Sequence, residues 1–146
     1  MAHRRIAIDP PIRTEPLAAA AASIKPGMLI RKASATTFNV HNVAGGQGGC
    51  RILLENEEMG SGVTTAVTNG EQAKIGHFCT GQRFAGLIKS GEVVAVDDAL
   101  ESDGAGGLRK HVDDSSAGTI EIGSIIAYCD EAGTGNGTTL FTCVAA

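Results

Sequence analysis

"VVAVDDALESDGAGGLRKHV", residues 93–112, predicts a β-hairpin. An apolar run leads to Asp103-Gly104, and a second β-prone run containing a basic pair follows. Because Asp-Gly readily supplies the positive φ of a tight turn, residues 100–102 and 108–112 are expected to pair as antiparallel strands. The stretch thus indicates a fold built from short strands and glycine-containing turns.

The acidic residues and glycines of this stretch raise two ligand-binding alternatives. An EF-hand-like frame ending on Asp103-Gly104 would place Lys110 where the bidentate Glu belongs. A phosphate loop ends in Gly-Lys-Ser/Thr, whereas Gly106-Gly107 is followed by Leu-Arg-Lys. A bend between two strands therefore explains the stretch better than a metal or phosphate site.

The same texture continues on both sides of the hairpin. Candidate strands cover residues 28–33, 36–43, 50–56, 71–78, 84–89, 91–96, 99–102, 108–112, 124–130 and 138–144. Turn signals separate them at Gly45-Gly46, Asn69-Gly70, Ser90-Gly91, Asp103-Gly104 and Asn136-Gly137. Since no long amphipathic helix pattern is present, the chain is expected to be mainly β, as a small β-barrel or β-sandwich.

The first 25 residues differ from the rest. They contain three of the four prolines and show no period of 2 or 3.6. We therefore expect residues 1–25 to form an extended N-terminal arm and residues 26–146 to form the β-barrel-like domain. Within the arm, Leu17–Ile24 could form two helical turns, which are marginal unless something packs on them.

Composition excludes several classes of function. The net charge is −4, with no Trp and a single Tyr, which argues against nucleic-acid binding by a basic, aromatic surface. No apolar run approaches the roughly 20 residues of a membrane span, and Asp9-Pro10-Pro11 interrupts the N-terminus before a secretion signal could form. With 20 Gly among 146 residues, the core is thin, and oligomeric contacts could supplement it.

The four cysteines are Cys50, Cys79, Cys129 and Cys143, and no two form a Cys-x-x-Cys pair. Free, mostly buried thiols are the expected state. The alternative is a disulfide between Cys129 and Cys143, which would face each other if the last two strands pair, although a cytosolic origin disfavours it. A zinc site that uses His77 and Cys79 is a weaker alternative, because it needs further converging ligands.

The residues offer no catalytic constellation. Asp97-Asp98 and Asp113-Asp114 are adjacent pairs, and neighbouring residues on a strand point to opposite faces. The four histidines are scattered, and no Ser or Cys has a recognisable partner motif. We therefore expect neither an enzyme nor a cofactor. A lipoyl or biotinyl carrier modified at Lys89 is an alternative, but the Met-Lys-Met setting of such carriers is absent.

The order of larger sequence pieces resembles the head decoration, or cement, proteins of tailed bacteriophages. The pieces are "IKPGMLIRK", "LLENEEMGSGVTTAVTNGEQAKIG", "AGLIKSGEVVAVDDALESDGAGGLRKHV" and "EIGSIIAYCDEA", which together span Ile24 to Ala132. The resemblance implies a β-barrel-like or sandwich domain with an N-terminal arm, assembled as a small oligomer on the outside of a capsid. The chain departs from the simpler family pattern in the glycine-rich "NVHNVAGGQGGC", residues 39–50.

This resemblance implies a partner and a location. The partner would be the major capsid protein of a tailed phage, and the location would be the exterior of the virion, after synthesis in the cytoplasm of the bacterial host. Because oligomers on a lattice tend to match its local symmetry, we expect a homotrimer, with a dimer as the second choice. A different virion component, such as a spike base, is the alternative within the same class.

We expect the arm to make most of the capsid contact. Its prolines withhold backbone donors, so its apolar side chains would need an outside surface, and its arginines would add contacts to an acidic shell. The candidate contact residues are Arg4, Arg5, Ile6, Ile8, Pro10, Pro11, Ile12, Arg13 and Leu17. The glycine-rich loop, residues 44–49, is the candidate if the arm is not the anchor.

Overall fold

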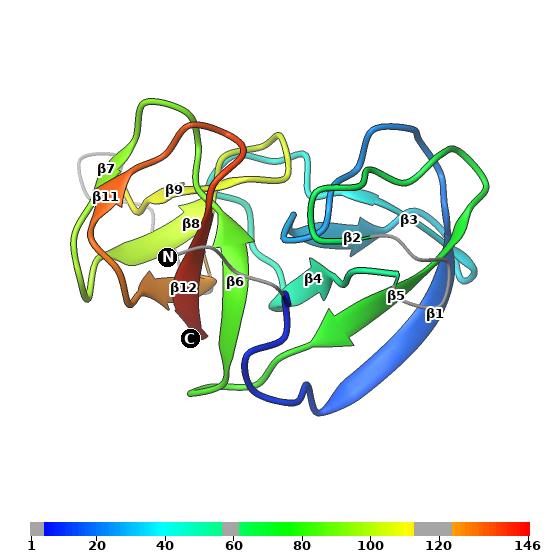
Figure 1. The fold of residues 1–146 in the computed structure, drawn as a ribbon, viewed down its shortest axis with the longest axis horizontal. Helices are drawn as coiled ribbons and strands as arrows, with labels where there is room; N and C mark the ends of the chain where they lie inside the picture. The colour runs from blue at the N-terminus through cyan, green and yellow to red at the C-terminus, as the bar shows by residue number, and fades with distance from the viewer. Residues whose placement is uncertain (1–4, 57–61, 113–123) are drawn as a thin grey trace.

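The computed structural model describes residues 5–56, 62–112 and 124–146, and these form an all-β fold (Figure 1). A first sheet has the order β2-β3-β1-β5-β4. Its strands are β1 (Arg13–Ala19), β2 (Ile30–Lys32), β3 (Thr37–Val40), β4 (Arg51–Leu53) and β5 (Gln72–His77). In the described parts of the chain, no helix is long and apolar enough to cross a membrane.

A second sheet has the order β6-β12-β10-β8-β9 and lies beside the first, on the left in Figure 1. Its strands are β6 (Arg83–Leu87), β8 (Ala99–Ser102), β9 (Leu108–Lys110), β10 (Ala127–Cys129) and β12 (Leu140–Ala145). A two-stranded ribbon pairs β7 (Val93–Val94) with β11 (Gly133–Thr134). The N-terminal half of the chain thus builds one sheet and the C-terminal half builds the other.

Both sheets curl so that their outer strands approach each other. An isolated bridge joins Leu29, just before β2, to Ile52 in β4, and another joins Ile88, just after β6, to Leu108 in β9. Neither sheet closes into a continuous barrel, so the mainly β prediction is confirmed in its sandwich-like form. Curling leaves fewer unpaired strand edges, which would otherwise favour aggregation.

The buried side chains form two clusters. One lies within the first sheet and includes Leu17, Phe38 and Ile75. The other is larger, is centred on the second sheet and includes Phe84 and Leu100, but it also takes in side chains from the N-terminal half. Those additional side chains are Ile6, Leu29 and Ile52, each fully buried. The second cluster therefore also joins the two halves of the protein.

The expected extended arm is wrong. Residues 6–9 lie alongside β6. Ala7 pairs with Phe84, and the Asp9 N–H donates to the Arg83 carbonyl at 3.0 Å. The chain then crosses to the first sheet and becomes β1, which lies between β3 and β5. Residues 6–19 thus pair with both sheets of their own chain, and the helical turns expected over residues 17–24 are replaced by strand pairing and a bend.

Pro16 sits inside β1 because its nitrogen faces an unpaired side of the strand. Ala18 and Ala20 donate their N–H groups towards β3. Successive N–H groups of a strand point to opposite sides, so the Pro16 nitrogen also faces β3. The β3 pairing covers only Ala18 and Ala19. The proline therefore costs no ladder hydrogen bond, as is usual for proline at an open edge.

The hairpin of residues 93–112 is confirmed. β8 and β9 pair in antiparallel register from Leu100↔Lys110 to Ser102↔Leu108, and Gly104 has φ +83°. The Asp103 carboxylate accepts hydrogen bonds from the N–H groups of Ala105 and Gly107 at 2.7 and 2.9 Å. Asp103 thus holds the turn together, and this role explains its place in the sequence without a ligand.

Candidate interaction surface

The structure separates the expected contact residues into exposed and buried groups. Arg5, Pro10, Ile12 and Arg13 are exposed, Ile8 and Pro11 are half-buried, and Arg4 lies outside the described residues. Ile6 and Leu17 are buried in the protein's own clusters. The expectation that these two residues contact a partner is therefore corrected. Their apolar surface is already buried within the chain and is not available to a capsid.

β1 begins beside the end of β5 (Figure 1), and a row of basic side chains crosses the first sheet there. His77 is the register partner of Arg13 on one side and of Arg51 on the other. Directly opposed residues of a sheet share a face, so the three side chains lie on one face. Two residues further along, that face carries Ile75 and Leu53, which are fully buried. The row therefore lies at the margin of the first core.

Glu15 balances part of this charge. Its carboxylate contacts the Lys32 ammonium, the Arg13 guanidinium at 3.2 Å and His77 Nε2 at 3.1 Å. The hydrogen bond from Lys32 is the main reason why the pKa of Glu15 lies below its usual value. Burial lowers the pKa of His77, and the charges of Arg13 and Arg51 lower it further. The hydrogen bond that His77 donates to the Glu15 carboxylate acts in the opposite direction. One carboxylate thus serves three basic groups.

One further arginine, Arg31, lies next to Lys32 in β2. Arg31 of β2 and Arg51 of β4 form no salt bridge within the described residues. Both line a pocket of about 260 Å³ beside the glycine-rich loop. We call the set Arg13, Arg31, Lys32, Arg51 and His77 the cationic rim. Its members come from β1, β2, β4 and β5: Arg13, Lys32 and His77 contact Glu15, whereas Arg31 and Arg51 line the pocket.

The glycine-rich loop forms the other wall of this pocket, through Val43, Gly46, Gly48 and Gly49. His41 holds the loop in place: its Nε2 lies 3.1 Å from the Gln47 carbonyl and its Nδ1 lies 2.8 Å from Ser102 Oγ. A carbonyl can only accept, so Nε2 carries the proton and Nδ1 of the neutral ring accepts from the serine hydroxyl. A Cβ on Gly48 would lie 3.1 Å from His41 Nε2, so a glycine suits this close approach.

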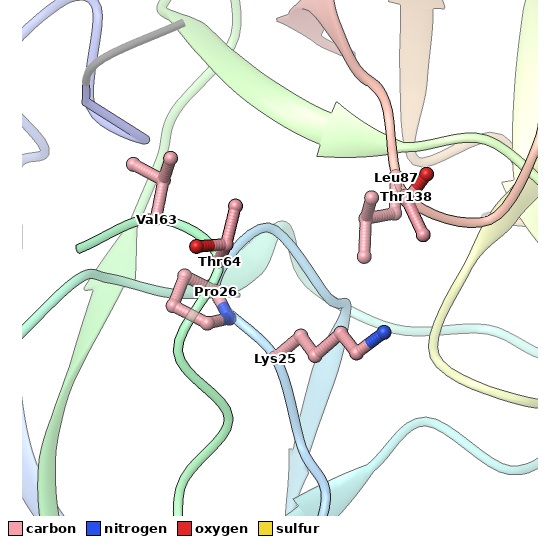
Figure 2. A pocket seen from close by; sticks show the side chains of 6 residues that line it. All are labelled: Lys25, Pro26, Val63, Thr64, Leu87 and Thr138. Atoms are coloured by element: carbon pink, nitrogen blue, oxygen red, sulfur yellow. The ribbon is translucent and has the colours of Figure 1, made fainter. Parts of the chain in front are cut away.

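A second pocket, of about 220 Å³, lies between the connections of the two halves (Figure 2). Its lining residues are Lys25, Pro26, Val63, Thr64, Leu87 and Thr138. Figure 2 shows the lysine extending across the pocket from the side of the first sheet towards Leu87 and Thr138. One cation and two hydroxyls among apolar groups could hold a small polar ligand, but they provide no acid–base pair.

The most buried charged group is Glu101, with 1% of its surface exposed. Its Oε1 accepts from Arg109 Nη2 and Nε at 2.7 and 2.8 Å, and its Oε2 lies 2.8 Å from His111 Nδ1. Both carboxylate oxygens are thus engaged by the same hairpin. Sequence analysis missed this cluster, although the hairpin register, which pairs Glu101 with Arg109, was the signal that could have found it.

Of the two candidate acid pairs, only Asp97-Asp98 lies within the described residues. Asp98 accepts the Ala95 N–H at 2.7 Å and pairs with Lys110 at 3.0 Å, and these contacts lower its pKa. Asp98 therefore holds a turn. The pair Asp113-Asp114 lies outside the described residues. Within the described parts, no group of three or more His, Cys, Asp or Glu is arranged to hold a metal.

All four thiols are free, and Cys129 and Cys143 are register partners across β10 and β12. Both are buried, Cys50 is half-buried, and Cys79 is exposed. The hydrogen bond between Cys129 and Cys143 lowers the pKa of Cys129 to about 7 and raises that of Cys143. The expected facing of these two residues is therefore confirmed, with their thiols unlinked.

The sequence matches no family model and no curated protein sequence. Among solved structures, the fold is similar to that of the N base of head fiber gp8.5 in bacteriophage phi29. The TM-score is 0.57 at 11% sequence identity, and the match covers 92% of this chain and 93% of that one. At this identity the likeness concerns the fold, which the two chains share over nearly their whole lengths.

Proposed function

We propose that this protein is a structural component of a tailed-bacteriophage virion that binds the outside of the head. The observation that carries the proposal is the shared fold with a phage head-fibre base over 92% of this chain. The order of sequence pieces that resembles phage decoration proteins supports the same class independently of the fold. The partner is the major capsid protein, and the proposal includes no catalytic activity, cofactor, nucleic acid or membrane.

Within this class, we favour a cement role, in which the protein stabilises the capsid lattice as a homotrimer. A second candidate, the base of a head fibre, is favoured by the similarity to a fibre base. The two roles differ in what binding does to the capsid. A cement protein raises the resistance of the shell to heat or denaturant, whereas a fibre base binds without changing it.

The test is co-sedimentation of purified full-length protein with undecorated capsids of a phage that encodes it. We expect saturable binding to the capsid exterior and an increase in the temperature at which the shell releases its DNA. Saturable binding without that increase would favour the fibre base. If no binding is detected at micromolar protein, the virion proposal is wrong.

The oligomeric state is tested separately by light scattering on the free protein. We expect three times the monomer mass, since contacts between copies would cover the exposed strand edges and supplement a thin core. Twice the monomer mass would support the dimer. A stable monomer at micromolar concentration would contradict both and leave assembly to the capsid itself.

A further inference from the structure

We propose that the cationic rim and the adjoining glycine-walled pocket bind an acidic segment of a protein partner through its Asp or Glu carboxylates. The inference rests on the proposed function in one respect, because it takes the major capsid protein as that partner. It is otherwise argued from the charges, the pocket and the apolar side chains of this surface.

The first argument is the local imbalance of charge. The chain as a whole carries a net charge of −4, whereas the rim contains four Arg or Lys side chains and one histidine, of which Arg13, Lys32 and His77 contact Glu15. Arg31 and Arg51 form no salt bridge in the described structure. A concentrated patch of this sign attracts a surface of the opposite sign and orients it before contact.

The second argument is the geometry of the pocket. Arg31 and Arg51 line one cavity of about 260 Å³, whose size suits a side chain of a partner better than a whole folded element. The guanidinium group presents a planar fork that matches a carboxylate with two parallel hydrogen bonds. The opposite wall is glycine backbone, fixed by the hydrogen bond between His41 and the Gln47 carbonyl at 3.1 Å. An entering carboxylate would relieve the repulsion between the two arginines.

The third argument is the presence of apolar side chains next to the rim. Val43 lines the pocket and has 54% of its surface exposed, while Ile12 precedes Arg13 and has 65% exposed. The Ile12 N–H donates to the His77 carbonyl at 2.9 Å, which fixes the backbone of Ile12 next to β5. Exposed aliphatic groups among arginines are typical of protein–protein interfaces.

The same features disfavour a nucleic acid as the occupant. Binding of single strands uses exposed aromatic side chains for base stacking. The four phenylalanines are buried, and Tyr128 belongs to β10 of the other sheet. The two arginines without a salt bridge in the described structure line one pocket, whereas a phosphate backbone is bound along a continuous basic track.

The experiment compares two double variants of the full-length protein. Arg31→Gln with Arg51→Gln removes two charges from the pocket. The control, Lys89→Gln with Lys110→Gln, removes two charges from the second half, one of them the partner of Asp98. Each variant is assayed for co-sedimentation with undecorated capsids at low and moderate salt. Each is also titrated with a poly-glutamate peptide and, separately, with single-stranded DNA. Far-ultraviolet spectra and unfolding midpoints check that both variants are folded.

We expect the arginine variant to lose about tenfold or more in capsid and poly-glutamate affinity, with a weaker dependence on salt, and the lysine variant to change less than about twofold. Equal capsid binding by both variants would overturn the rim as the contact and leave the virion proposal standing. If the wild-type protein does not bind capsids but binds poly-glutamate in a rim-dependent way, only the virion proposal is overturned. DNA binding tighter than poly-glutamate binding would overturn the inferred partner.

Discussion

The two sheets carry charge in opposite ways. In the second sheet, Glu101 is buried and both of its oxygens are held by Arg109 and His111 of the same hairpin. In the first sheet, Glu15 is partly exposed and is outnumbered by basic groups of the cationic rim. A charge paired completely inside the chain contributes to the fold, whereas a surplus of one sign at the surface is available to a partner.

The difference originates in how each cluster is assembled. Glu101 and Arg109 are register partners across one short hairpin, so pairing of β8 with β9 brings them together directly. Arg13, Arg51 and His77 come from three strands distant in sequence and meet only because β5 has a neighbour on each side. The rim therefore depends on completion of the first sheet, and the first sheet depends on β1.

The largest expected effect follows from deleting residues 1–19. The deletion removes β1 from between β3 and β5 and takes Ile6 and Leu17 out of the two cores. We expect loss of cooperative unfolding and of the β-type far-ultraviolet spectrum, because the first sheet loses its middle strand. Ile12→Ser is the control, since that side chain is exposed and its loss should leave both readings unchanged. A truncated protein that still unfolds cooperatively would show that the second sheet folds without the first.

The next effect compares the two carboxylates directly. Glu101→Ala leaves Arg109 partly buried without its partner and should lower the free energy of unfolding by about 3–5 kcal/mol. Glu15→Ala removes a more exposed group and should cost much less, because its partners remain hydrated. Chemical denaturation of both variants measures the difference. Equal losses would mean that burial does not distinguish the two clusters.

The turn chemistry made most strand positions predictable. Each predicted Gly turn contains a glycine at positive φ: Gly45, Gly70, Gly91, Gly104 and Gly137. Apart from β11, which no expected range covers, the strands between these turns lie within or overlap the expected ranges, and β8 matches residues 99–102. A glycine at positive φ is a local requirement, so it can be predicted from the residues beside it.

β1 and the rim could not be predicted in this way. Pro16 and the alanine run after it predict an irregular or helical segment, and only pairing with β5 makes the segment a strand. Because β1 was missed, its register with His77 was missed as well, and with it the approach of Arg13 to Arg51. Arg13 was expected as a contact residue, but Arg31, Arg51 and the pocket needed the three-dimensional structure.

A smaller perturbation is thiol labelling, which compares local opening of the two sheets. Cys79 is exposed and should react first. Cys50, just before β4, is half-buried, and burial raises its pKa to about 12, so it should react more slowly. Cys143 should react last, because it is buried between paired strands and its pKa is raised. Cys129 is also buried, but its pKa of about 7 leaves access as the factor that limits its labelling.

Mass spectrometry of labelled peptides against time would give this order. In denaturant without reductant, four equivalents of reagent are expected. Two equivalents would indicate that Cys129 and Cys143 had formed the alternative disulfide. Labelling of Cys143 before Cys50 would mean that the second sheet opens more readily than the first, contrary to the greater burial of its thiols.

The smallest expected effect is the response of the rim to acid. The folded pKa of His77 lies below the usual histidine value of about 6.5, chiefly because of burial, so the unfolded chain binds the proton more readily. This contribution to stability is complete above about pH 6.5 and is lost as the pH falls towards the folded pKa. The lowered pKa of Glu15 acts in the same direction at lower pH, because its stabilising ionised form is lost below its own folded pKa.

His77→Gln should therefore reduce the loss of unfolding midpoint between pH 7.5 and 5.5, a window in which Glu15 stays ionised. Glu15→Gln should enlarge that loss, because the carboxylate is the group that supports the charged imidazole against burial and the two arginines. Opposite changes from two residues in direct contact would not arise from a general effect of acid on the fold. If both substitutions change the loss of midpoint between pH 7.5 and 5.5 in the same direction, His77 does not sense the charge of the rim. The balance inferred from its register partners would then be wrong.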